Sequence, residues 1–256
     1  MICVYCKGIN SKKITKEHLI SRSVLEAIFG QENRNITKSD LFGGKVLIDH
    51  EHKVRDVCDY CNNKLLSPYD KAGANFVKEI SKSYDATDKQ LTVDFKILAW
   101  LLKTHLNHIR IIPERGTKNY YPISQDIYTG IIKGDISLFS RLKLFVEGWQ
   151  GLPYFWDEND GKKIQFFSYR SVCFPYQKIL VSNFRIKWLD TFIVIPSDLD
   201  YSDFEQRVNL TIDAMKANYG FYLQSLDAKT AIEDGRINIE KIVKTEELLK
   251  VIKLDR

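Results

Sequence analysis

The sequence lacks long apolar runs, internal repeats and flexible linkers. No stretch approaches the roughly 18 uncharged apolar residues that a transmembrane helix requires, so we expect no membrane partner. The first residues, MICVYCKGINSKK, carry cysteines where a signal peptide has an apolar core, so we expect a cytoplasmic protein. The 256 residues are 44% apolar and 28% charged, which is typical of a globular chain long enough to bury a sizeable core.

A large excess of charge of one sign is also absent. Thirty-eight Lys and Arg residues oppose thirty-three Asp and Glu residues, which leaves a net charge of +5. This small excess favours a polyanionic partner only weakly. Most of it lies in residues 1–24, where the single acidic residue Glu17 is accompanied by five basic ones: Lys7, Lys12, Lys13, Lys16 and Arg22.

Cysteine is scarce, but four of the five cysteines form two C-x-x-C pairs. The pairs are Cys3 with Cys6 and Cys58 with Cys61, and they leave Cys173, which we interpret as a core thiol. In a cytosolic protein such pairs indicate metal binding rather than disulfides. Four thiolates close a tetrahedral zinc site with no open position, so the predicted zinc is structural. The alternative is four reduced cysteines buried in a compact core.

The distribution of apolar residues predicts an α+β fold in two parts, residues 1–75 and a mixed helical and β-rich domain over 76–256. In the first part we expect strands over 15–20, 45–48 and 53–57, and helices over 23–29 and 58–66, with Ser67-Pro68 as the end of the last helix or a break after it. In the second part we expect helices over 95–109, 123–132, 136–145 and 204–219, and strands between 164 and 195. His105 and His108 lie three residues apart on a predicted helix, where surface or capping histidines are commoner than metal ligands.

The two cysteine pairs would bring two polar dipeptides together. Glu17-His18 follows the first pair and Asn62-Asn63 follows the second, so a shared zinc would fasten a carboxylate, an imidazole and an amide side by side. Glu17 and Asn62 offer the hard oxygen ligands that Mg²⁺ or Mn²⁺ prefers. In an extended strand His18 points away from Glu17, but strand twist or a bulge would let His18 act as base towards a water beside the metal. The alternative is that Glu17-His18 is a surface pair.

Three segments follow one another in a specific order: the first C-x-x-C, then T-K-E-H-L-I-S-R-S, then V-C-D-Y-C-N-N. Together, over roughly residues 3–70, they resemble the HNH endonucleases, in the zinc-stapled branch of the ββα-metal nucleases. The resemblance implies that Glu17 and Asn62 bind a divalent metal and that His18 is the general base in hydrolysis of a phosphodiester bond. An imidazole in water is mostly neutral near pH 7 and can accept a proton.

One position departs from the HNH pattern. The family has an asparagine in the strand that leads to the second cysteine pair, and its amide orients the base. Here that position falls near His52 or Lys53, with no asparagine present. His52 would either hydrogen-bond His18 or bind metal.

These observations predict a metal-dependent endonuclease acting on nucleic acid, with DNA as the expected substrate. Lys12, Lys13, Lys16 and Arg22 would bind backbone phosphates, although a solvated loop explains the same charges. Chains of similar layout occur in bacterial anti-phage defence, which by analogy suggests a regulatory partner such as an ATPase or a sensor. A single HNH site cuts one strand at a time, so duplex breaks would favour a homo-oligomer. The alternative function is a non-catalytic zinc-knuckle module that binds nucleic acid or a protein.

Overall fold

The computed structural model confirms the α+β class and describes most of the chain. The described residues are 2–11, 13–29, 36–39, 45–48, 53–82, 89–111, 123–150, 154–157, 162–165, 167–219, 223–239 and 242–244. Helices and strands are mixed along the sequence, and no described helix is long and apolar enough to cross a membrane.

The N-terminal part is built from a two-stranded ribbon that leads into a helix. Its elements are β1 (Ile14–His18), α1 (Arg22–Phe29), β2 (Ile36–Ser39), β3 (Lys45–Ile48), β4 (Lys53–Cys58), a π-helical segment (Cys61–Leu66) and α2 (Ser67–Ile80). Strands β1 and β4 pair antiparallel, as do β2 and β3. In β4 the buried Val54 lies between the exposed Lys53 and Arg55, and Val57 is buried beyond the irregularity in the pairing with β1, so one face of the ribbon packs inward.

The helix predicted after the second cysteine pair ends at Leu66, and Ser67-Pro68 begins a further helix directly after it. The π-helical segment runs directly into α2, and Pro68 lies in the first turn of α2. Proline has no backbone N–H to donate, but the first turn of a helix needs no such donor. Pro68 is therefore tolerated at the transition from the π-helical segment to α2, and α2 extends to Ile80.

A six-stranded sheet forms the centre of the remaining chain. Its strands are β6 (Lys143–Gln150), β9 (Phe167–Phe174), β10 (Ile179–Ile186), β11 (Leu189–Pro196), β12 (Gln224–Leu226) and β14 (Ile242–Lys244). Their order is β12-β6-β11-β10-β9, and β14 pairs parallel with β6. Two smaller pairs join β5 (Gln90–Thr92) to β13 (Arg236–Asn238) and β7 (Tyr154–Asp157) to β8 (Lys162–Gln165).

Most of the predicted helices of this region are confirmed. The confirmed helices are α3 (Phe95–Ile111), α4 (Gln125–Lys133) and α5 (Phe204–Tyr219), and the structure adds α6 (Ala228–Asp234), which was not predicted. The predicted helix over 136–145 is wrong in its second half, because a 3₁₀ segment (Ile136–Arg141) gives way to β6. Strand β6 pairs with both β11 and β12, and this tertiary pairing overrides the local helical pattern.

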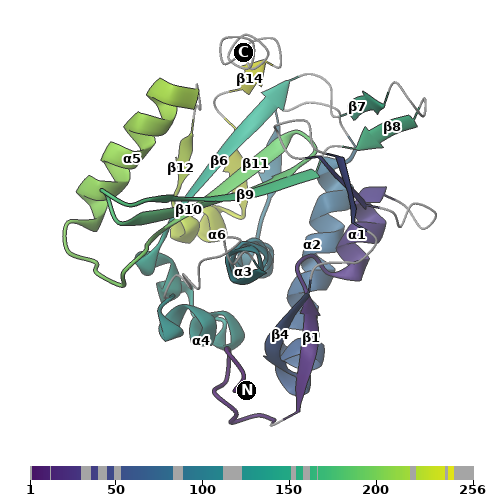
Figure 1. Cartoon of the computed structure of the whole chain (residues 1–256), viewed down its shortest axis with the longest axis vertical. Coiled ribbons are helices and arrows are strands. Elements are labelled where there is room, and N and C mark those ends of the chain that lie inside the picture. Colours follow the sequence, from purple (N-terminus) through teal and green to yellow (C-terminus); the bar gives the residue numbers. More distant parts are fainter. Residues whose placement is uncertain are drawn as a thin grey trace.

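The sheet is covered on both faces, and α3 lies against one of them. Figure 1 shows α3 end-on below β9 and β10, with α5 on the other side of the sheet and the β1–β4 ribbon beside α2. All eight residues of β11 are buried, as expected for a strand that has a helix on each side. On the α5 side, Phe204, Val208 and Ile212 pack in one core cluster with Phe192.

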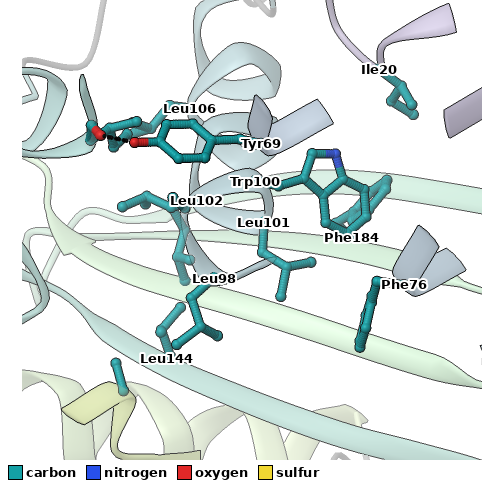
Figure 2. Close-up of a cluster of buried hydrophobic side chains, with 14 of the residues drawn as sticks. Ile20, Tyr69, Phe76, Leu98, Trp100, Leu101, Leu102, Leu106, Leu144 and Phe184 are labelled. Atoms are coloured by element: carbon teal, nitrogen blue, oxygen red, sulfur yellow. Dashed lines mark hydrogen bonds between the residues drawn. The ribbon is translucent and has the colours of Figure 1, made fainter. Parts of the chain in front are cut away.

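The larger core cluster is continuous between the N-terminal part and the rest of the chain. It includes Cys3 and Tyr5 of the N-terminal segment, Leu98 and Leu102 of α3, and Leu144 of the sheet. Figure 2 shows the α3 leucines with Trp100 and Phe184, and the hydroxyl of Tyr69 donating to a backbone carbonyl, that of Ile131 at 2.7 Å. Helix α3 is therefore the shared centre of the molecule.

Candidate functional site

The two cysteine pairs come together as the sequence predicts. The Sγ atoms of Cys3, Cys6, Cys58 and Cys61 all lie within 4.8 Å of one another, and all four residues are buried. The sulfurs of Cys6 and Cys58 are 3.6 Å apart, close to the edge of about 3.8 Å that four sulfurs at about 2.3 Å from a tetrahedral zinc would have. These four residues could hold a metal ion such as zinc.

Local backbone and hydrogen bonds hold the sulfurs in place. The turn after Cys6 uses left-handed backbone at Gly8, whose φ is +83°, a conformation that glycine adopts without strain. The N–H of Cys61 donates to Cys58 Sγ at 3.5 Å, and the side-chain amide of Asn10 donates to Cys61 Sγ at 3.6 Å. Such N–H···S bonds stabilise thiolates and fix metal ligands.

The surroundings shift the pKa values of Cys6, Cys58 and Cys61 in different directions. Burial raises the pKa of Cys58 and that of Cys61. At Cys6 burial acts in the same sense, but hydrogen bonds from the Asn10 backbone and from neighbouring thiols outweigh it and lower the pKa to about 6. A metal would therefore displace protons from Cys58 and Cys61 when it binds.

His18 and Asn62 are both associated with β1. His18 is the last residue of β1 and is half-buried. The Asn62 amide nitrogen donates to Thr15 Oγ1 at 3.1 Å and to the Lys16 carbonyl at 3.3 Å. The structure thus brings Asn62 against β1, one strand position before the Glu17-His18 dipeptide.

Glu17 points away from His18, into the core. The β1–β4 pairing is irregular between Thr15 and Glu17, but this irregularity does not bring Glu17 to the face of His18. Glu17 is only 3% exposed, and its Oε1 lies 2.6 Å from Nζ of Lys103 in α3. The same ammonium lies 2.7 Å from both carboxylate oxygens of Asp70 in α2.

The Glu17–Lys103–Asp70 cluster is a buried ion triad with one cation and two anions. Burial alone would lower the pKa of Lys103, but the two carboxylates outweigh it and raise that pKa. Burial also raises the pKa of Asp70 in spite of the ammonium beside it. Lys103 is therefore protonated, and its charge occupies the position that a cation at Glu17 would take.

The described residues fit a metal at the cysteines and do not fit one at Glu17. Among them, the cysteine cluster is the only group of three or more Cys, His, Asp or Glu side chains close enough to share a metal ion. A divalent ion on Glu17 would have to displace the Lys103 ammonium, which lies 2.6 Å from the Glu17 carboxylate. Glu17 and Asn62, the ligands predicted from the sequence, thus both lie at β1 but do not form a metal site.

One face of α3 contacts the ribbon at three points. Lys103, Asn107 and Arg110 share this face at spacings of four and three residues. The Asn107 amide donates to the His18 carbonyl at 2.9 Å, and Arg110 Nε lies 3.0 Å from a carboxylate oxygen of Asp56 in β4. Arg110 also lies over the rings of two tyrosines, Tyr5 beside the first cysteine pair and Tyr128 in α4.

The outer face of the ribbon is basic. Lys13, Lys16, Lys53 and Arg55 are exposed, and Lys53 is the register partner of His18 across β1 and β4. Arg22 is exposed too, but its guanidinium pairs with Glu26 at 2.9 Å one turn further along α1. We use the name basic ribbon face for the surface formed by the exposed Lys16, Lys53 and Arg55 together with His18.

Two predicted site residues, His52 and Lys12, lie outside the described residues. Sequence reasoning gave no phosphate-binding role to Lys53 and Arg55, although their spacing around Val54 indicated an exposed strand face. It also missed Lys103 and Asn107, whose signal was a stripe of polar residues along an otherwise apolar helix. The expected surface position of His105 and His108 is wrong, since both are buried and contact the Ser182 hydroxyl.

No family model, curated protein or solved structure matches this chain.

Proposed function

We propose that the chain is an endonuclease of the HNH type that hydrolyses phosphodiester bonds in nucleic acid, DNA in the first instance. The observation that carries the proposal is the position of His18, which ends a cysteine-stapled strand and belongs to the basic ribbon face. Exposed Lys and Arg side chains attract backbone phosphates, so a phosphodiester would be drawn to the imidazole.

The cysteine cluster would bind zinc with a purely structural role. Four thiolates fill the tetrahedral coordination of zinc and leave no position for water or substrate. The cluster joins the segment before β1 to the helix after β4. Zinc would therefore hold β1, β4 and Asn62 in their mutual arrangement.

In the proposed reaction His18 takes a proton from the attacking water. The nearby Lys53 and Arg55 bind the phosphate oxygens and orient the scissile bond. Glu17 and Asp70 pair with Lys103 behind the strand, so the buried Glu17 carboxylate does not lie on the outer face. General-base catalysis of this kind typically contributes about 10²–10⁴-fold to the rate.

The resemblance to HNH enzymes adds Mg²⁺ or Mn²⁺ to the proposal. Such an ion supplies positive charge to the phosphate and to the leaving oxygen. Because the Lys103 ammonium pairs with the Glu17 carboxylate, the described residues do not hold the ion by themselves. The ion would enter bound to the substrate phosphate, as Mg²⁺ commonly does.

A second candidate function is a non-catalytic zinc-knuckle module that binds nucleic acid or a protein. The observation in its favour is the buried ion pair between Glu17 and Lys103, which removes the expected metal ligand from the surface. This candidate shares the basic ribbon face with the first and differs only in chemistry.

A cleavage assay separates the two functions. Wild type and His18→Ala are incubated with supercoiled plasmid DNA and with single-stranded RNA in Mg²⁺, Mn²⁺ or Ni²⁺. The nuclease predicts nicking by wild type and none by the variant, whereas binding without cleavage under every metal supports the knuckle module.

The role of the basic ribbon face is tested by measuring binding to the same nucleic acids. The Lys53→Gln/Arg55→Gln double variant should weaken binding and reduce its salt dependence by about two charges. Lys133→Gln/Lys216→Gln removes two exposed charges from α4 and α5 and is the matched control. Equal binding by the two double variants would remove the ribbon face from the proposal.

A further inference from the structure

The backbone of His18 is held by a side chain from far along the sequence. The Asn107 amide of α3 donates to the His18 carbonyl at 2.9 Å, at the point where β1 ends. We propose that Asn107 is the positioning residue for His18, and this inference rests on the proposed role of His18 as the base. With Asn107 in this role, an asparagine within the β1–β4 ribbon is not needed to orient His18.

The surroundings of Asn107 allow it to hold the backbone of His18 in one orientation. The residue is fully buried, so the amide has one defined environment. Its Oδ1 accepts a hydrogen bond from Arg110 at 2.6 Å, which orients the amide with its nitrogen towards His18. Arg110 in turn pairs with Asp56 on the partner strand β4. The chain of contacts therefore runs from β1 through α3 to β4.

The bond acts on the imidazole through the backbone. The direction of the His18 carbonyl defines the peptide plane that follows the residue, and with it the direction in which the side chain leaves the strand. His18 is the last residue of β1, so the Asn107 bond adds a side-chain anchor at the point where the strand ends. A base that is misplaced by about 1 Å can lose on the order of 10²-fold in rate, so this constraint bears on catalysis.

Helix α3 is thereby part of the nuclease site. Its opposite face is fixed to the sheet, where His105 contacts Ser182 of β10 at 3.0 Å and Thr191 of β11 at 3.1 Å. The base is positioned against a helix that is anchored on the sheet, so the segment over 1–75 is incomplete without α3.

The test uses two substitutions at Asn107 and one control on the same helix. Asn107→Asp keeps an acceptor for Arg110 but has no N–H for the His18 carbonyl, and Asn107→Ala removes the amide without adding charge. Thr104→Val is the matched control, because the buried Thr104 hydroxyl also donates to a carbonyl, that of Trp100 within α3 at 2.9 Å.

The first readout is the kinetics of cleavage by the full chain. Both Asn107 variants should lower kcat by about 10- to 100-fold and leave KM within about twofold, since Asn107 does not contact the substrate. Thr104→Val should change neither constant by more than about twofold. Normal kcat in both Asn107 variants, with active wild type, would overturn the inference and leave the proposed function standing.

The second readout does not depend on activity. Histidine-labelled protein gives an NMR signal for the His18 ring, which His18→Gln identifies by its loss. The signal should shift or broaden in both Asn107 variants and stay unchanged in Thr104→Val. An unchanged His18 signal in the Asn107 variants overturns the inference even if wild type cleaves nothing, whereas absence of cleavage with a shifted signal overturns only the proposed function.

Discussion

Lys103 is the residue on which the interior of the ribbon depends. Its ammonium lies 2.6 Å from a carboxylate oxygen of Glu17 and 2.7 Å from one of Asp70. Removing one partner of a buried ion cluster leaves uncompensated charge, which costs far more than the cluster contributes when intact. The residue is 1% exposed, so water cannot replace it without opening the core.

We therefore expect Lys103→Met to destabilise the fold by about 3–5 kcal/mol at pH 7, measured by chemical denaturation. Lys96→Met is the matched control, because Lys96 lies on the same helix and is exposed. A loss in Lys103→Met no larger than that in the control would show that the triad does not bear on stability.

The cysteines lead to a second prediction at the residue scale. The purified protein should contain about one zinc per chain, as measured by elemental analysis, and Cys58→Ser should lose it. Cys173→Ser should keep it, because the half-buried Cys173 packs against the core outside the cluster. Since metal binding must displace protons from the thiols with raised pKa values, zinc affinity should fall as the pH is lowered from 7. Equal zinc content in the two variants would contradict this site.

Sequence reasoning works well for residues whose role depends on local spacing. Two C-x-x-C pairs identify Cys3, Cys6, Cys58 and Cys61 because the spacing itself makes a chelating turn. The same reasoning fails for Glu17, since its role depends on a lysine 86 positions later. No local sequence pattern predicts which helix will place a cation beside Glu17.

At the scale of elements, α3 performs two tasks with its two faces. One face carries Lys103, Asn107 and Arg110 against the ribbon, and the other carries His105 against the sheet. Apolar periodicity predicts the helix, but it does not say that its polar residues are buried. They are buried because α3 has a neighbour on each side, which only the tertiary arrangement shows (Figure 1).

The sheet-facing side of α3 predicts a pH dependence. Burial, and to a smaller extent His108, lowers the pKa of His105 from 6.5 to about 3. Above pH 6.5 His105 is neutral in the folded and the unfolded chain, and its contribution to stability is complete. Below that pH the unfolded chain binds a proton that the folded chain cannot accept, so stability falls until about pH 3.

Denaturation between pH 6 and pH 4 should show this loss, with a slope of up to about 1.4 kcal/mol per pH unit from this residue. His105→Gln should be less stable at pH 7 and should show a shallower slope over the same range. A slope that is the same in both proteins would mean that His105 does not titrate as its burial implies.

The packing of α2 on α3 depends on a single glycine. A Cβ atom at Gly73 would lie 2.2 Å from the ring of Trp100, far inside contact distance. Gly73→Ala should therefore destabilise the protein by about 1–3 kcal/mol in spite of the better helix propensity of alanine. Asn75→Ala, at an exposed position of the same helix, should be neutral or slightly stabilising, and thermal unfolding of both variants measures the difference. Equal melting temperatures would mean that the Trp100 ring moves aside at little cost.

At the scale of the whole molecule, the division expected at residue 75 falls inside a continuous core. Composition changes near that point, because cysteines and glycines give way to apolar runs. Yet Tyr5 contacts Tyr128 of α4 with ring centroids 5.4 Å apart, and the Gln125 amide donates to the Val4 carbonyl at 2.8 Å. Composition reports the character of a segment and says nothing about what packs against it, so these contacts could not be predicted.

The proposed activity also belongs to the whole molecule, since it needs the cysteine staple, the basic ribbon face and α3 together. The most direct test is the ratio of single-turnover cleavage rates of wild type and His18→Ala on one nucleic-acid substrate with Mg²⁺ or Mn²⁺. A ratio of about 10²–10⁴ is the predicted result. Equal rates, or no cleavage by the wild-type protein under any metal, would contradict the account.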